Sequence, residues 1–128
     1  MYELWFNFVY GLDLLKKMKS PTFDSDGYPS DQTLRDISYW YTLNGYTPKE
    51  FFQFCEEAFN KYYGSWEIVE NYNNDLLKDK PFTALRIATG GWSANESVID
   101  HMKTTIFWSI WKASVSGGLY ILDYDKVK

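Results

Sequence analysis

The chain of 128 residues contains one cysteine and one histidine, and these shortages exclude several kinds of protein. Cys55 has no second cysteine with which to form an internal disulfide, so a secreted disulfide-rich domain is excluded. Cys55 and His101 are too few for the nitrogen and sulfur ligands of a zinc site. Asp24, Asp26 and Asp31 share one loop, but the glycine and glutamate of an EF-hand are misplaced around them. We therefore predict no metal and no other cofactor.

Long apolar runs are also missing. The most apolar stretch, residues 2–15, is interrupted by Glu3, Asn7 and Asp13 and is shorter than the roughly 20 apolar residues of a membrane-spanning helix. No basic segment precedes this stretch and no small-residue cleavage site follows it, so it does not resemble a signal peptide. We expect a cytoplasmic protein that does not bind membranes.

Basic charge is scarce in the first part of the chain. The net charge is −4, and residues 1–80 carry 13 acidic and 8 basic side chains, whereas residues 81–128 carry 4 and 5. Proteins that bind nucleic acid directly need a basic footprint, which this balance does not provide. An acidic surface instead favours approach to a basic surface on another protein.

Aromatic side chains are abundant, with 6 Trp, 11 Tyr and 9 Phe. The consecutive aromatic residues at 39–41 and 62–63 cannot all face one core, because neighbours on a helix diverge by about 100°. Exposed Tyr and Trp side chains beside acidic residues are typical of protein-recognition surfaces. We therefore predict a partner-binding surface made of Glu50, Glu56, Glu57, Glu67, Glu70, Tyr39, Tyr41 and Tyr63.

The first 80 residues are expected to form about four helices. The apolar spacing of residues 2–15 fits either a helix or an alternating strand, and the good helix formers that end the segment favour a helix. Ser30 is the predicted N-cap of a second helix that ends near Leu43. A Thr-Pro-Lys-Glu capping box at 47–50 predicts the start of the third.

The fourth predicted helix begins at Ser65 and ends before Pro81. Its apolar side chains recur at helical spacing from Ile68 onward. Glu67 and Glu70 are three positions apart, so we expect them to share one exposed face of this helix.

Residues 81–128 read as β-α-β-β. Residues 82–88 predict a strand, and Ser93 with Glu96 forms a second capping box that starts a short helix. Residues 105–113 are apolar on both faces and predict a central strand, parallel to the first because a helical crossover joins them. Residues 119–124 follow a glycine turn and predict the second strand of a hairpin.

These elements predict an α+β fold in a single domain spanning residues 1–128. An N-terminal helical, acidic part of about four helices, residues 1–80, would pack on a small C-terminal β-α-β-β sheet, residues 81–128. A chain of this length buries enough apolar surface to be stable without disulfides or metals.

No residue pattern predicts an enzyme. His101 lies at the edge of an apolar helix stripe, and its neighbour Asp100 points about 100° away from it, so we expect a partly buried structural histidine. Cys55 lies among phenylalanines, where a thiol is inert and its pKa is raised. Gly90-Gly91-Trp92 before a helix is superficially like a phosphate-binding turn, but it lacks the spacing of the known phosphate motifs. We expect a structural turn there, in which Trp92 packs.

The C-terminal part resembles a widespread group of small phage and prophage proteins. The shared element reads T-G-G-W-S-x-N-E, then F-W, then G-G-x-Y, and stands here as residues 89–96, Phe107-Trp108 and residues 117–120, about a third of the chain. The resemblance implies a phage origin and brings no catalytic residues with it. Small acidic phage proteins of this kind include anti-CRISPR proteins, which occupy the basic nucleic-acid channels of RNA-guided nucleases.

Two functional hypotheses follow. The first is a non-enzymatic inhibitor of a host defence nuclease of the anti-CRISPR type, which docks its acidic, aromatic surface on a basic surface of the nuclease. The second is a phage accessory or structural module that self-associates through the N-terminal aromatic helix, with Phe6 and Tyr10 in the contact.

Overall fold

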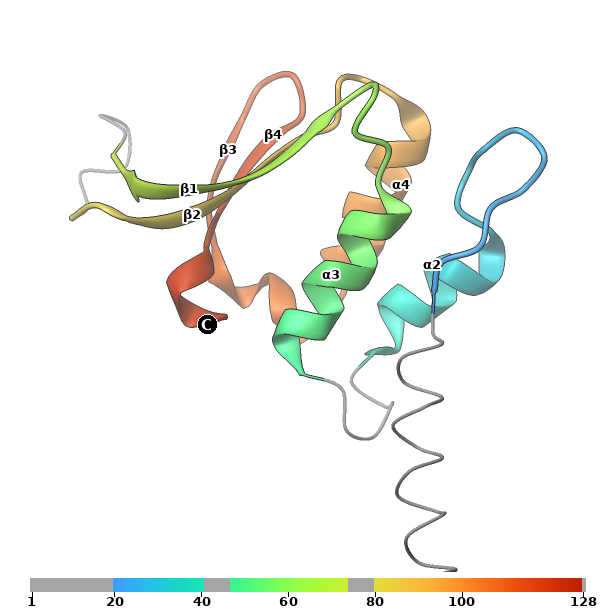
Figure 1. Ribbon diagram of the computed structural model, residues 1–128, viewed down its shortest axis with the longest axis horizontal. Helices are drawn as coiled ribbons and strands as arrows, with labels where there is room; N and C mark the ends of the chain where they lie inside the picture. Colours follow the sequence, from blue (N-terminus) through green and yellow to red (C-terminus); the bar gives the residue numbers. More distant parts are fainter. Residues whose placement is uncertain (1–19, 41–46, 74–79, 128) are drawn as a thin grey trace, which may run out of the picture.

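The structure is a computed structural model and describes residues 20–40, 47–73 and 80–127 (Figure 1). The predicted first helix and Tyr41 therefore lie outside the described residues. The elements are, in chain order, α2 (Asp31–Ser38), α3 (Pro48–Ala58), β1 (Ser65–Tyr72), β2 (Phe82–Ala88), α4 (Ser93–Met102), the 3-10 helix η2 (Ile106–Ile110), β3 (Trp111–Val115), β4 (Leu119–Asp123) and the 3-10 helix η3 (Tyr124–Lys126).

The four strands form one antiparallel sheet in the order β1-β2-β4-β3. The strands on either side of the α4 crossover run parallel, as predicted, because β2 and β3 each pair antiparallel with β4, which lies between them. The predicted central strand over residues 105–113 is wrong, since Ile106–Ile110 forms the 3-10 helix η2 and the extended part, Trp111–Val115, is an edge strand. The predicted β3–β4 hairpin and the strand at 82–88 are confirmed.

The fourth predicted helix is a strand. β1 begins at Ser65 and pairs antiparallel with β2, so the expected division into a helical part up to residue 80 and a separate sheet is wrong. The broader α+β class holds. Trp66, Ile68 and Val69 have high strand propensity, and pairing with the buried β2 outweighed the helical spacing of the same residues.

The helices cover one face of the sheet (Figure 1). α3 and α4 lie against the sheet, and α2 lies beside them. The core between the two layers combines Phe51, Phe52, Phe54, Cys55, Ala58 and Phe59 of α3 and its end, Val98, Ile99 and Met102 of α4, and Trp66, Leu85, Ile87 and Leu122 of the sheet. None of the described helices is both long enough and apolar enough to cross a membrane.

Local capping chemistry fixes the start of the first two helices described. The Ser30 side chain accepts the N–H of Thr33 and begins α2, as predicted. Thr47 caps α3 by accepting the N–H of Glu50 at 3.2 Å, and Pro48 occupies the first turn, so the predicted start of this helix is confirmed.

Candidate partner-binding surface

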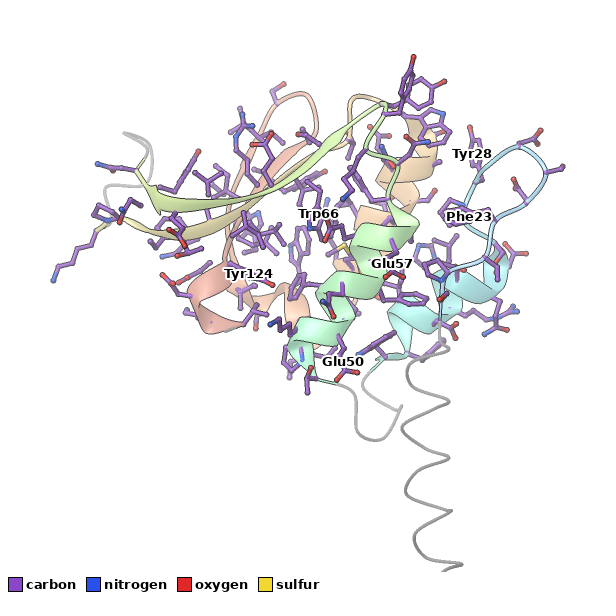
Figure 2. The ribbon with its side chains drawn as sticks, viewed as in Figure 1. Phe23, Tyr28, Glu50, Glu57, Trp66 and Tyr124 are labelled. Atoms are coloured by element: carbon purple, nitrogen blue, oxygen red, sulfur yellow. The ribbon has the colours of Figure 1, made fainter. Side chains whose placement is uncertain are left out.

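Four aromatic side chains form a cluster, which we call the aromatic corner, where three loops meet. Tyr28 comes from the loop before α2, Tyr62 and Tyr63 from the α3–β1 connection, and Trp92 from the β2–α4 connection. The Trp92 ring contacts Tyr63 with centroids 4.9 Å apart and Tyr28 at 5.4 Å. Tyr62 meets Tyr63 edge to face at 5.1 Å. Figure 2 labels Tyr28 on its loop beside these connections.

Much of this aromatic surface faces solvent. Tyr62 is 88% exposed and Tyr63 is 55% exposed, although each is in contact with another ring. The hydroxyl of Tyr28 lies 2.8 Å from Oγ of Ser93. Such a cluster offers large apolar area together with polar tips, which is the combination enriched in protein–protein interfaces.

Two glycines allow the loops of the corner to cross in backbone contact. A Cβ on Gly90 would lie 1.8 Å from the carbonyl oxygen of Tyr63, and a Cβ on Gly64 would lie 2.3 Å from that of Ala88. Gly90 also has a φ of +68°, a conformation that L side chains rarely adopt. No larger residue fits at this crossing, which holds Tyr63 next to Trp92.

Asn95 ties the same two loops together from beneath. Its side chain is almost fully buried; Oδ1 accepts the N–H of Asn60 at 2.8 Å, while Nδ2 donates to the carbonyl oxygens of Asn60 at 3.0 Å and Thr89 at 3.2 Å. Asn60 in turn accepts the N–H of Tyr62 through its own side chain at 2.8 Å. The amide of Asn95 therefore fixes the turn that presents Tyr62 and Tyr63.

The β3–β4 turn joins this arrangement through Thr89. The N–H of Thr89 donates to the carbonyl oxygen of Gly118 at 3.0 Å, and a Cβ on Gly118 would lie 2.2 Å from Oγ1 of Thr89. Residues 89–95 and the glycines of the G-G-x-Y turn thus pack as one unit. The T-G-G-W-S-x-N-E segment and the G-G-x-Y turn together support the aromatic corner.

The loop that carries Tyr28 is also tied by an aspartate. Oδ1 of Asp24 accepts the N–H groups of Asp26 at 2.9 Å and Tyr28 at 3.0 Å, while Phe23 and Pro29 form a β-bridge. Asp24 therefore stabilises a turn. Within the described residues there is no group of three or more His, Cys, Asp or Glu side chains that could hold a metal ion.

The start of α4 differs from the prediction. Trp92, not Ser93, is the N-cap, and no side chain caps the helix. Ser93 is instead in hydrogen-bonding distance of Tyr28. The predicted Ser93–Glu96 capping box is wrong. The backbone is extended at Trp92, directly after Gly90 and Gly91, so Ser93 is the first helical residue and not the N-cap.

The predicted acidic residues of α3 lie along its solvent side but differ in their surroundings. Glu56 pairs with Lys61 at 2.6 Å, and Oε1 of Glu50 accepts the Thr47 hydroxyl at 3.3 Å. Glu57 is exposed, and Figure 2 shows it on α3 farther along the helix than Glu50. Of the three carboxylates, that of Glu57 is the most exposed, and it lies near the end of α3 that leads to the aromatic corner.

The remaining predicted site residues are spread over the molecule. Glu67 and Glu70 lie on β1, and they share no helix face because the segment is a strand; Arg86 of β2 stands opposite Glu67. Tyr39 is 58% exposed, as predicted, but follows α2 at the end of the molecule where α3 begins, whereas the corner lies beyond the end of α3 (Figure 1). The structure therefore brings Tyr63, but not Tyr39, into the aromatic corner.

The two side chains considered for catalysis, His101 and Cys55, are held by contacts within the fold. Nδ1 of His101 lies 2.7 Å from the carbonyl oxygen of Ser97, one turn earlier in α4, and the ring is half-buried, as predicted. Cys55 is fully buried among the core side chains, and this burial raises the pKa of its thiol well above the ordinary value, as predicted. Burial, and to a smaller extent the Glu56 carboxylate, raises the pKa of the Tyr124 hydroxyl.

Sequence reasoning missed Tyr28 and the role of Asn95. The paired tyrosines at 62–63 were a visible signal, but nothing in the sequence places Tyr28 next to a tryptophan 64 positions later. Comparisons with protein-family models, curated protein sequences and solved structures found no match to this chain.

Proposed function

We propose that this protein is a non-enzymatic binder that attaches to another protein through the aromatic corner. The observation that carries the proposal is that Tyr62 and Tyr63 are exposed although their loop is rigidly supported by Asn95 and by the glycine crossing at Gly90. Binding that orders few side chains loses little conformational entropy, so a rigid aromatic surface suits recognition. Tyr and Trp are also the side chains that most often dominate binding energy.

The partner in this proposal is a host defence nuclease, inhibited in the manner of an anti-CRISPR protein in the cytoplasm of an infected bacterium. The resemblance to phage proteins supports the phage origin, and the net charge of −4 supports a basic partner surface. Glu57, exposed on α3, is the acidic residue that we assign to this contact. Basic side chains of the partner would pair with Glu57 and stack on the tyrosine rings.

A matched pair of variants tests the use of the corner. Tyr62→Ala combined with Tyr63→Ala removes two exposed rings, while Tyr39→Ala removes a ring outside the corner whose exposure is close to that of Tyr63. We expect purified wild-type protein to block target-DNA cleavage by one or more of a panel of RNA-guided nuclease complexes. The double variant should weaken binding by about 30-fold or more, because a central aromatic residue contributes about 2 kcal/mol or more. Equal inhibition by all variants would refute the role of the corner.

Charge reversal tests the acidic contribution separately. Glu57→Lys should slow association and make it less sensitive to salt, whereas Glu70→Lys, on the β1 edge away from the corner, should have little effect. Light scattering on the same samples addresses the second hypothesis. A stable homo-oligomer that binds none of the nuclease complexes would favour the self-associating module.

A further inference from the structure

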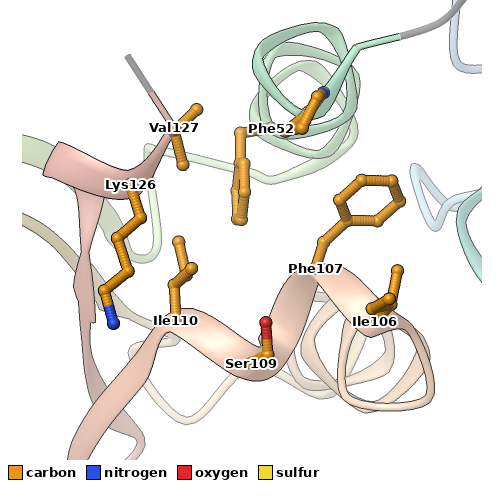
Figure 3. Close-up of a pocket in the computed structure, with 8 residues that line it drawn as sticks. Phe52, Ile106, Phe107, Ser109, Ile110, Lys126 and Val127 are labelled. Atoms are coloured by element: carbon orange, nitrogen blue, oxygen red, sulfur yellow. The ribbon is translucent and has the colours of Figure 1, made fainter.

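A pocket of about 250 Å³ lies at the other end of α3, between the start of that helix, η2 and η3 (Figure 3). Its walls are apolar and its polar groups are few. The lining residues are Pro48, Phe52, Ile106, Phe107, Ser109, Ile110, Lys126 and Val127. None of them belongs to the aromatic corner, so the pocket is independent of the proposed function.

The pocket walls are held by the core. The Phe107 ring stacks on buried Phe51 with centroids 4.3 Å apart, and Phe52 is itself buried in the core. A pocket with such walls is largely formed before a ligand arrives, so binding costs little rearrangement.

The third wall, η3, is tied to the sheet. Oδ2 of Asp125 accepts the N–H of Thr83 in β2 at 3.0 Å, and the N–H of Val127 donates to the carbonyl oxygen of Tyr124 at 3.0 Å. These bonds fix the backbone on both sides of Lys126, whose side chain borders the pocket.

Two polar groups at this pocket have no partner within the described residues. Figure 3 shows the Ser109 hydroxyl pointing into the space between Phe107 and Ile110, with Lys126 beside Ile110 at the edge. One is a neutral hydrogen-bond donor and the other a cation, and no carboxylate lines the pocket. The charge complement is an anionic head group on an apolar body.

We propose that this pocket binds a small amphiphilic carboxylate, with its chain among Phe52, Phe107 and Ile110 and its carboxylate at Ser109 and Lys126. A cavity of about 150 Å³ holds benzene, so by proportion about 250 Å³ holds roughly ten non-hydrogen atoms. Octanoate has this size. The carboxylate would accept the Ser109 hydroxyl proton in a hydrogen bond and pair with the Lys126 ammonium.

The test is titration of the full chain with octanoate, octanol and octylammonium, followed by amide chemical shifts. We expect saturable octanoate binding, with shifts concentrated at residues 106–110 and 126–127. An exposed ion pair changes affinity by about twofold to fivefold. Octanol, which lacks the charge, should therefore bind about twofold to fivefold more weakly than octanoate, and octylammonium, which is repelled by Lys126, should bind more weakly than octanol. Lys126→Ala should reduce octanoate to the level of octanol, and Lys80→Ala, which does not line the pocket, should change nothing.

A second variant separates binding from charge. Ser109→Phe adds a ring at an exposed position that points into the pocket, and it should abolish binding of both octanoate and octanol without unfolding the chain. Absence of saturable binding up to about 10 mM, well above the dissociation constants of useful small ligands, would overturn the proposal. So would equal affinity for all three probes, or a dimer that Ser109→Phe dissociates, since a second copy would then be the occupant.

Discussion

Replacing Asn95 by alanine tests whether its amide holds the aromatic corner together. The change removes three hydrogen bonds, two with Asn60 and one with Thr89, from a nearly fully buried position. Each such bond contributes about 1 kcal/mol net, so the free energy of unfolding should fall by about 3 kcal/mol. That is a large part of the ~5–15 kcal/mol by which a typical domain is stable.

The assay is urea unfolding followed by tryptophan fluorescence, with thermal unfolding by circular dichroism as a second measure. A loss of about 3 kcal/mol should lower the melting temperature by roughly 12 °C in a domain of this size. Asn73→Ala is the matched control, because Asn73 is exposed at the end of β1 and its removal should change stability by less than about 0.5 kcal/mol.

Asn95→Asp tests whether stability is lost because the two Nδ2 hydrogen bonds are removed or because a cavity is left behind. The aspartate keeps the acceptor for the N–H of Asn60 but turns a carboxylate toward the carbonyl oxygens of Asn60 and Thr89. Burial and those oxygens should raise its pKa in the folded protein, so the variant's stability should decrease as pH rises above the ordinary aspartate pKa of about 3.9. A loss below about 1 kcal/mol for Asn95→Ala, or a pH-independent Asn95→Asp, would refute the reasoning.

Three further predictions follow from local geometry. Gly90→Ala should lower the free energy of unfolding in urea by at least about 2 kcal/mol more than Gly91→Ala. Both glycines have positive φ, but only a Cβ on Gly90 would strike the Tyr63 carbonyl oxygen. Equal losses for the two variants would contradict this. Thr47→Ala should cost about 1 kcal/mol and Thr47→Ser much less; equal unfolding midpoints would exclude a capping role. Cys55 should react with iodoacetamide about 100-fold more slowly in native than in unfolded protein, and rapid native labelling would disprove its burial.

Local chemistry predicted the elements whose ends are set by neighbouring residues. The start of α3 depends on Thr47, Pro48 and Glu50, all within one turn, and the structure has it where the sequence indicates. The strand at 82–88 was also recognisable, since five of its seven residues are apolar and Pro81 and Gly90 bound it.

The elements that the sequence misplaced depend on distant partners. The residues of β1 fit both helical and extended spacing, and the choice was made by pairing with β2. η2 is rich in apolar residues because it packs at the end of the core, with Phe107 stacked on Phe51. No spacing rule within residues 105–113 carries that information.

The candidate surface was predictable only where adjacent residues determine it. The adjacent tyrosines at 62–63 indicated that an aromatic ring must be exposed, and Tyr63 is. The neighbours of that ring, Trp92 and Tyr28, come from other loops, and only the fold brings them together. Tyr39 satisfied the same sequence criterion but lies elsewhere, because α2 and the α3–β1 connection point to different ends of the molecule.

The order of the strands has a consequence for how the chain folds. β1 pairs with β2 and β3 with β4, each with its sequence neighbour, whereas the central β2–β4 pairing joins Ala84 to Asp123 across α4 and η2. Closing such a distant contact loses chain entropy before its hydrogen bonds form. The local pairs β1–β2 and β3–β4 should therefore form early in folding, and the β2–β4 pairing should form late. The hydrogen bond from Thr89 to Gly118 continues the β2–β4 pairing into the loops. The scaffold of the aromatic corner is therefore expected to be complete only in the final step of folding.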